Sequence, residues 1–355
     1  MRQRCDFSHL PTKQEIAPPM FFGHASPSRR GTPAVTNLPM RPTAPVGWAR
    51  REEAIMGTAV SVELWSADRA TGEAAIAAVM AEMHRIDAAM SPHKPESELS
   101  CINRDAASRA VPLSEEMFAL VARSLEFSEL SGGAFDITYA GVGHLYDYRL
   151  RLKPSDAELA AAQATVGHQH LLLDAKQRTL RFARPGVRID LGGFAKGHAV
   201  DRGAAILARH GIQHAIVSAG GDSHVIGDRR GRPWTIAIAD PRRRGEVVAV
   251  LPLEDVAIST SGDYERFFVG ADGVRCHHLI DPKTGKSPSG VRSVTILADD
   301  GLTTEALSKT VFVLGLEKGM RLIESQNGVD AVVVDASGVL HYSRGLLAGG
   351  LQARQ

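Results

Sequence analysis

Strand-like and helix-like segments follow one another in an irregular order along this 355-residue chain, and that order limits its fold more than any other feature. Residues 59–64 alternate apolar and polar side chains, as a half-buried strand does. The other predicted strands are 187–191, 214–218, 234–239, 293–298 and 331–334, and the predicted helices are 71–89, 114–130, 196–210 and 304–314. Because strands and helices do not alternate regularly, we expect an α+β fold rather than a doubly wound parallel sheet.

Two of the predicted helices carry capping signals. Thr71 is the predicted N-cap of the first helix and Ser114 that of the second. The second helix is expected to stop at residues 131–133 (SGG), because glycine readily adopts the left-handed conformation that ends helices.

The first 48 residues are rich in proline and poor in side chains that can build a core. Eight of the 18 prolines lie there: Pro11, Pro18, Pro19, Pro27, Pro33, Pro39, Pro42 and Pro45. We therefore expect residues 1–48 to form a disordered tail and residues 49–355 to form the globular domain. The segment lacks the apolar core of a secretory signal, and Cys5 does not follow an apolar run, so the sequence as written predicts a cytoplasmic protein. A start site further upstream would instead allow a periplasmic or inner-membrane-associated protein.

Charge and cysteine content narrow the class of protein. Lys and Arg total 41 against 40 Asp and Glu, a net charge of +1, which argues against a general nucleic-acid binder. Cys5, Cys101 and Cys276 are widely spaced, so they predict neither a disulfide framework nor a clustered zinc site. A membrane-spanning helix needs a run of about 18 apolar residues, and the sequence contains none.

Residues 190–201 (DLGGFAKGHAVD) are the most informative segment. A predicted buried strand ends at Asp190, two glycines allow close backbone approach, and a helix begins near Lys196. The free N–H groups and the dipole at the start of a helix favour an anionic ligand. From these residues alone, an ordinary tight turn is as good an interpretation as a phosphate site.

Four further segments combine glycine with hydroxyl, carboxylate or histidine side chains. They are residues 131–138, 218–222, 259–268 and 277–285. Each alone is typical of a loop with an Asx-type turn. Several such segments in one chain are hard to explain by packing, so we predict that they line one cleft for a polar, phosphate-bearing ligand.

Eight motifs occur in order between about Met56 and about Ser343. They are MGT at 56–58, PESELSCIN at 95–103, GGAFD at 132–136, DLGGFAKG at 190–197, AGGD at 219–222, TSGDYER at 260–266, HLIDPKTG at 278–285 and EALSKTVFVLG at 305–315. With these motifs the chain resembles the FAD:protein FMN transferases, also called ApbE-like flavin transferases. Eight ordered motifs make this resemblance far more specific than any single one.

The resemblance implies an α+β fold of the T-fold kind, with mixed or antiparallel sheets and packed helices, and a cleft that binds FAD. It also implies a Mg²⁺-dependent reaction in which the FMN moiety of FAD passes to a threonine hydroxyl of an acceptor flavoprotein and AMP is released. Two alternatives remain open. One is an FAD pyrophosphatase that uses water as nucleophile, and the other is a non-catalytic flavin-binding protein with a decayed metal site.

The resemblance also assigns roles to individual residues. Those expected to contact FAD are Met56, His93, Ala134, Phe135, Asp136, Asp190, Lys196 and Leu279. The metal-ligand positions are the carbonyl of Gly193 and the side chains of Glu305 and Ser308. His278 matches the histidine regarded as important for transfer. Because an unperturbed imidazole titrates near neutral pH, His278 is the candidate general base.

The sequence departs from the family pattern at two positions of the EALSKTVFVLG motif. Relatives usually have Asp where this chain has Glu305, and Thr where it has Lys309. Glutamate remains a plausible oxygen ligand, whereas a charged lysine has no lone pair for a metal. Either Lys309 points away from a metal held by Glu305 and Gly193, or its ammonium partly replaces the charge of that metal. At helical spacing i, i+4, the two residues are also able to form a simple ion pair.

Overall fold

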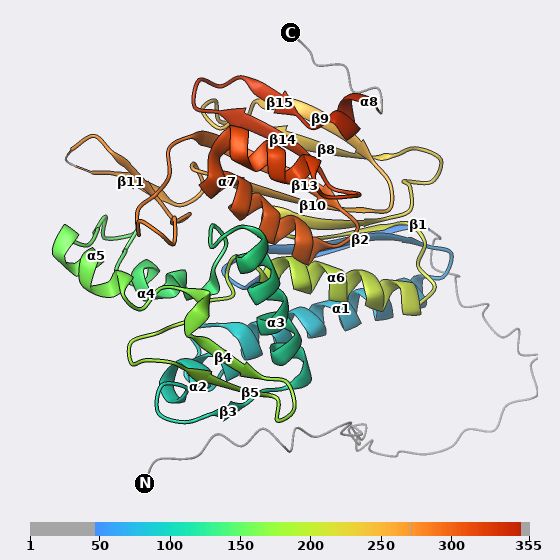
Figure 1. Ribbon diagram of the computed structural model, residues 1–355. Helices are drawn as coiled ribbons and strands as arrows, with labels where there is room; N and C mark the ends of the chain where they lie inside the picture. Colours follow the sequence, from blue (N-terminus) through green and yellow to red (C-terminus); the bar gives the residue numbers. More distant parts are fainter. Residues whose placement is uncertain (1–46, 271, 349–355) are drawn as a thin grey trace, which may run out of the picture.

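An eight-stranded antiparallel sheet is the largest element of the fold (Figure 1). The computed structural model describes residues 47–270 and 272–348. In spatial order the sheet contains β1 (Gly47–Ile55), β2 (Thr58–Ser66), β6 (Ala215–Ala219), β7 (Asp222–Ile226), β10 (Val256–Gly262), β13 (Val291–Ala298), β14 (Asp330–Asp335) and β15 (Leu340–Tyr342). Residues 1–46 of the predicted tail lie outside the described residues, while Gly47 and Trp48 belong to β1.

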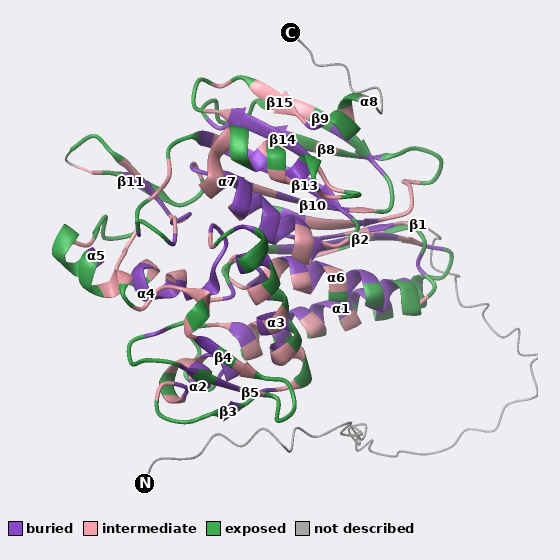
Figure 2. Cartoon of the chain, viewed as in Figure 1, coloured by how far each residue is buried: buried purple, intermediate pink, exposed green. Residues whose placement is uncertain are grey.

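Three long helices cover one face of this sheet. They are α1 (Arg69–Met90), α6 (Ala195–Arg209) and α7 (Gly301–Glu324). Helix α1 packs on β1 and β2, α6 on β6 and β7, and α7 on β10, β13 and β14. The facing sides of helices and sheet are buried (Figure 2). Burial of these apolar side chains supplies the main driving force for this layer arrangement.

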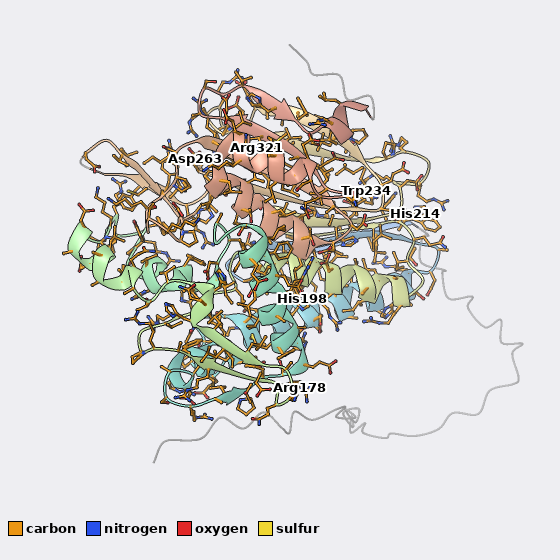
Figure 3. The ribbon with its side chains drawn as sticks, in the orientation of Figure 1. Arg178, His198, His214, Trp234, Asp263 and Arg321 are labelled. Atoms are coloured by element: carbon orange, nitrogen blue, oxygen red, sulfur yellow. The ribbon has the colours of Figure 1, made fainter. Side chains whose placement is uncertain are left out.

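The opposite face of the sheet is covered by the hairpin of β8 (Trp234–Ala239) and β9 (Val247–Leu253). A second, smaller core lies between them and includes Trp234 and Leu251 of the hairpin with Val225, Ile258 and Val332 of the sheet. Trp234 is labelled in Figure 3. The sheet is therefore apolar on both faces, with helices on one side and a hairpin on the other.

The remaining elements lie mainly between α1 and α6 in the chain. They are α2 (Glu98–Asp105), β3 (Val111–Pro112), α3 (Glu115–Leu130), η1 (Ile137–Tyr139), α4 (Ala140–Gly143), α5 (Asp156–Gln163), η2 (His168–His170), β4 (Leu171–Asp174) and β5 (Thr179–Phe182), followed later by β11 (Phe267–Val269), β12 (Arg275–His277) and α8 (Arg344–Ala348). Strands β3, β5 and β4 form a small separate sheet. Helices together with antiparallel sheets confirm the α+β expectation.

Most predicted elements are confirmed, with shifts at their ends. The predicted helix at 114–130 begins after its expected N-cap, Ser114, whose side chain accepts a hydrogen bond from Met117 N. The prediction of Thr71 as the first N-cap is wrong. The cap is Asp68, whose carboxylate accepts hydrogen bonds from Ala70 N and Thr71 N, so the helix begins at Arg69. The predicted helix 304–314 is part of the longer α7, which is interrupted at Gly315 by a φ of 75°.

The predicted strand at 187–191 is wrong. The structure has no strand there, and the backbone of Ile189 bonds to a side chain instead. Asn103 Oδ1 accepts from Ile189 N at 2.8 Å, and Asn103 Nδ2 donates to Ile189 O at 2.9 Å. A run of apolar residues identifies a buried segment, but it does not show whether a strand or a side chain satisfies its backbone. None of the helices in the described ranges is both long and apolar enough to cross a membrane.

Candidate functional site

Four charged side chains meet where α6, β7 and α7 approach one another. Lys196 lies at the start of α6, Asp222 begins β7, and Glu305 and Lys309 are one turn apart on α7. The ammonium of Lys196 contacts Glu305 Oε1 and lies 2.7 Å from Asp222 Oδ2. The ammonium of Lys309 lies 3.1 Å from the same Glu305 Oε1. We call these four residues the charge cluster.

Close packing of α6 against α7 brings these charges together. A Cβ added at Gly197 would overlap the carbonyl of Gly301, so the two helix starts approach backbone to backbone. The N–H of Gly197 also donates to Glu305 Oε2 at 2.7 Å. Only glycine permits this approach, which explains why the lysine of the DLGGFAKG motif is followed by glycine.

Burial decides the electrostatics of the charge cluster. Glu305 is 0% exposed and Asp222 is 2% exposed. Burial acts to raise the pKa of Asp222, but the attraction of Lys196 and then Lys309 outweighs it and lowers that pKa. Burial acts to lower the pKa of Lys196, and its two carboxylate partners raise it above the usual value. For Lys309, burial dominates and lowers the pKa, since its carboxylate partner is opposed by repulsion from Lys196.

One carboxylate oxygen of the charge cluster receives no hydrogen bond from the described residues. Asp222 Oδ1 is buried without a hydrogen-bond partner among the described residues. A buried, unpaired acceptor is costly in a protein interior, so such an atom often faces a ligand or a bound ion.

The turn at 190–193 lies directly beside Lys309. A Cβ added at Gly193 would be 3.7 Å from Lys309 Cε, which places the turn against the aliphatic part of that side chain. Asp190 Oδ1 accepts from Gly192 N at 2.6 Å. Burial raises the pKa of Asp190, while this hydrogen bond and the nearby ring of His93 oppose the shift. His93 itself is exposed.

His278 lies near the charge cluster, in the loop that directly follows β12. Its backbone N–H donates to Arg266 O at 3.1 Å, and Arg266 Nη2 donates to Gly57 O at 3.3 Å. This links His278 to the turn that contains Met56, a non-glycine residue at a φ of 54°. Burial, followed by repulsion from Lys309, lowers the pKa of His278 to about 3. Its Nδ1 atom is buried and has no partner in the described part of the chain.

The GGAFD segment supports the site through packing and internal hydrogen bonds. The ring of Phe135 packs at 5.6 Å from Phe194, and Ala134 is buried beside it in sequence. Asp136 Oδ1 accepts from Thr138 N at 2.8 Å, and Asp136 Oδ2 accepts from His168 N at 2.6 Å. The backbone N–H of Asp190 donates to Ile137 O at 2.9 Å, and this bond joins the segment to the turn at 190–193, called the glycine turn below.

Two other predicted site residues are buried. Leu279 belongs to the main hydrophobic core. Ser308 is fully buried, donates to Glu305 O at 2.9 Å, and lies 2.8 Å from Ser261 Oγ and 3.2 Å from Ser259 Oγ. The structure therefore gathers the predicted site residues in one region, with Leu279 and Phe135 as part of its apolar support.

Sequence reasoning missed four residues of this region. Asn103, Asp222 and Arg266 lie in motifs that carry the family resemblance, but no role was assigned to them. Tyr139 carries no sequence signal at all. Its hydroxyl lies near the turn at 190–193, and burial, followed by repulsion from Asp190, raises its pKa well above the usual value.

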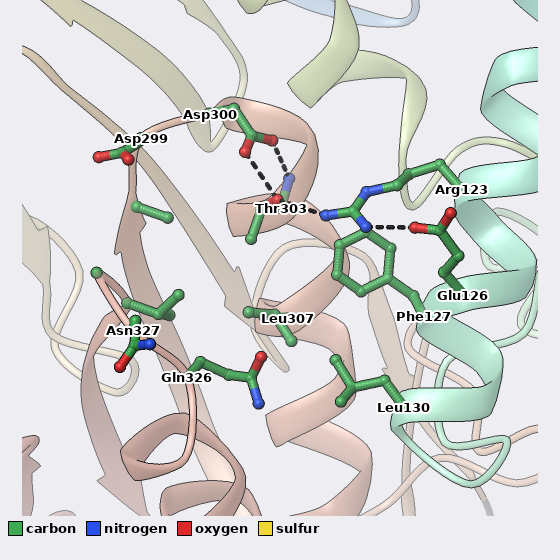
Figure 4. Close-up of a pocket in the computed structure, with 13 residues that line it drawn as sticks. Arg123, Glu126, Phe127, Leu130, Asp299, Asp300, Thr303, Leu307, Gln326 and Asn327 are labelled. Carbon is green, nitrogen blue, oxygen red and sulfur yellow. Dashed lines mark hydrogen bonds and ion pairs between the residues drawn. The ribbon is translucent and has the colours of Figure 1, made fainter.

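A separate pocket lies between α3 and α7 (Figure 4). Its volume is about 420 Å³, and Arg123, Glu126, Asp300 and Thr303 line its polar side. In Figure 4 the guanidinium of Arg123 contacts Glu126, and Asp300 bonds Thr303 at the start of α7. These polar groups already satisfy one another, and none of the charge-cluster side chains reaches this pocket.

Comparison with known proteins identifies the family. The family model described as "ApbE family" matches residues 56–333. A Treponema pallidum protein named FAD:protein FMN transferase is 32% identical over 303 residues, covering 80% of this chain and 83% of that protein. A Haemophilus influenzae protein of the same name is 34% identical over 269 residues, covering 73% and 78%.

Solved structures agree with the sequence comparison. The crystal structure of an ApbE protein from Thermotoga maritima superposes with a TM-score of 0.78 at 33% identity, covering 87% of this chain and all of that one. The flavin transferase ApbE from Vibrio cholerae gives a TM-score of 0.76 at 28% identity, covering 86% and 99%. The match over most of both chains leaves one conclusion: this protein belongs to the ApbE family.

Proposed function

We propose that this protein is an FAD:protein FMN transferase, which moves the FMN half of FAD onto an acceptor protein. The observation that carries the proposal is the convergence of the motif segments on the charge cluster, where Asp222 Oδ1 and His278 Nδ1 are buried polar atoms with no partner among the described residues. Relatives that carry this activity in their names, at 32% and 34% identity over most of their length, support it.

The acceptor group in the proposed reaction is a threonine hydroxyl. Its oxygen attacks the phosphorus of the FMN phosphate, and a new P–O bond to threonine forms as the bond to the bridging oxygen breaks. AMP leaves with that oxygen, and the hydroxyl proton passes to a base. Such a transfer depends on alignment and on neutralisation of phosphate charge.

His278 is the proposed base. With a pKa lowered to about 3, its ring is neutral at pH 7 and has an acceptor nitrogen available. An imidazole this weak is a poor base in the free protein. An anionic diphosphate bound beside it would favour the charged form and raise the pKa towards the working range. FAD binding thereby prepares the residue that takes the proton.

The remaining contacts to FAD stay predictions. They involve Met56, His93, Ala134, Phe135, Asp136, Asp190, Lys196 and Leu279. The location of the protein in the cell also stays a prediction.

A flavinylation assay tests the proposal. The purified chain is incubated with FAD and an acceptor flavoprotein, and covalent fluorescence in a denaturing gel and AMP release are measured together. We expect one AMP for each flavin attached, and no attachment when the target threonine of the acceptor is replaced by alanine. His278→Asn should slow transfer by on the order of 10²- to 10⁴-fold while FAD still binds.

Two outcomes would contradict the transferase assignment. AMP release at the same rate without an acceptor would identify a pyrophosphatase. Tight FAD binding with no release of AMP under any condition would identify a flavin-binding protein.

A further inference from the structure

The residues at the expected metal positions do not fit a divalent cation. Glu305 Oε1 contacts the ammonium groups of Lys196 and Lys309, and Glu305 Oε2 accepts from Gly197 N at 2.7 Å. The hydroxyl of Ser308 is occupied by neighbouring oxygens in the core. In the described residues, no group of three or more His, Cys, Asp or Glu side chains is placed to hold a metal ion. A hard cation such as Mg²⁺ needs several free oxygen ligands. The Glu305 and Ser308 oxygens are already engaged, and the one carboxylate oxygen here without a partner among the described residues, Asp222 Oδ1, belongs to a group paired with the ammonium of Lys196.

An ammonium group lies beside the residues expected to hold the metal. Lys309 Nζ lies 3.1 Å from Glu305 Oε1, the expected carboxylate ligand. The side chain of Lys309 runs along Gly193, whose carbonyl is the other expected ligand. Lysine carries no lone pair when charged and repels a metal cation. The same position therefore excludes Mg²⁺ and supplies a positive charge of its own.

The two lysines of the charge cluster are not equivalent. Lys196 bonds two carboxylates, at Asp222 and Glu305. Lys309 bonds one, and within the described residues this is its single ion pair. An ammonium has three N–H groups, so Lys309 keeps donors for a further anionic partner. Its side chain is 18% exposed and so remains accessible to a ligand.

We propose that the ammonium of Lys309 is the resident cation of this site and binds the diphosphate of FAD in place of a divalent metal ion. This inference rests on the proposed function, because the proposed function is what identifies the ligand as FAD. In the transfer step, Lys309 keeps its proton and donates hydrogen bonds to the diphosphate oxygens as negative charge moves to the departing AMP. The bonds made and broken are those of the transfer described above, and no metal is consumed or required.

An FAD-binding titration of the full-length protein tests this inference without any acceptor protein. Quenching of flavin fluorescence measures the binding. After exhaustive chelation the affinity should stay within about threefold of its value in Mg²⁺. Lys309→Met removes the charge at similar length and should weaken binding by about tenfold or more, with no recovery in Mg²⁺. Lys318→Met, an exposed lysine on the same helix, is the matched control and should leave the affinity unchanged.

A direct metal titration tests the same inference on the wild-type protein, so the result does not depend on whether Lys309→Met folds. The wild-type protein, titrated with Mn²⁺ as a spectroscopic probe, should bind no ion at this site. Lys309→Thr removes one of the two ammonium groups at Glu305 Oε1 and adds an oxygen ligand, so it should gain both Mn²⁺ binding and Mg²⁺-dependent FAD affinity. Stoichiometric Mn²⁺ binding by the wild type that competes with Mg²⁺ and is lost in Glu305→Gln would overturn the inference. Loss of FAD affinity on chelation would overturn it as well.

The outcomes separate this inference from the proposed function. Metal-independent, Lys309-dependent FAD binding without transfer to any acceptor supports the resident cation and contradicts the transferase. Transfer that stops on chelation supports the transferase and contradicts the resident cation.

Discussion

Two clusters of linked acidic and basic side chains in the described part of the chain differ in burial. The charge cluster lies under the ends of α6, β7 and α7, with both carboxylates almost inaccessible. The second cluster, which we call the surface network, joins α1, α3 and α6 on the outside of the helix layer. It consists of Glu82, Arg85, Glu116, His198 and Arg202. His198 is labelled in Figure 3.

The contacts within the two clusters are alike. In the surface network, Arg85 lies 2.8 Å from Glu82 and 2.7 Å from Glu116, and His198 lies 2.8 Å from Glu116. The side chain of Arg85 is nonetheless 46% exposed. Water and salt screen such a network, so each of its pairs contributes little. Desolvation makes the buried cluster expensive, and loss of one partner there leaves an uncompensated charge. Similar distances thus correspond to very different energetics.

The largest expected effect is the loss of one carboxylate from the charge cluster. Glu305→Gln leaves the ammonium groups of Lys196 and Lys309 facing each other with Asp222 as their one acidic partner. We expect the free energy of unfolding to fall by about 3–5 kcal/mol. Denaturant unfolding measures it, with Glu116→Gln in the surface network as the matched control. Equal losses of unfolding free energy in the two variants would show that burial does not set the energetics of the two clusters apart.

A second expected effect is a different pH dependence of the free energy of unfolding for His278, which lies near the charge cluster, and for the surface network. The pKa of His278 is about 3 in the folded protein against an ordinary 6.5, so the unfolded chain binds the proton more tightly. Its contribution to stability is fully present above pH 6.5 and is lost as the pH falls towards 3. At pH 5.5 the loss is roughly 1.4 kcal/mol.

The surface network responds in a lower pH range. Burial acts to raise the pKa of Glu116, but His198 and Arg85 lower it to about 2 from 4.5. Its contribution is therefore complete above pH 4.5 and lost below it.

The free energy of unfolding, measured from pH 7 to 5, should show a decline that His278→Asn reduces. A decline unchanged by that variant would contradict the assignment.

The smallest expected effect concerns the surface network itself. Arg85→Met removes two ion pairs but keeps most of the aliphatic side chain, so we expect a loss below about 1 kcal/mol. The loss should shrink further at high salt, because exposed charges are screened. A loss of the size expected for Glu305→Gln would mean that exposure does not govern the difference between the clusters.

Local patterns predicted much of the fold. Alternation and helical spacing located β2, β13, α3 and α6, because each element buries one face against the same core. Prediction of the strand at 187–191 failed for a physical reason. Asn103, more than 80 residues earlier, provides the donor and acceptor that a neighbouring strand normally supplies. No local pattern contains that partner.

Residue identities alone determined the family, the reaction to expect and the mismatch at Glu305 and Lys309, because ordered motifs are properties of the chain. Tertiary structure decided what the mismatch means. Packing of Gly197 against Gly301 brings α6 and α7 together and places Lys309 beside the glycine turn instead of in solvent. Whether an ammonium meets water, a carboxylate or a ligand depends on such through-space distances, and electrostatic energy depends on distance and burial rather than on separation along the chain.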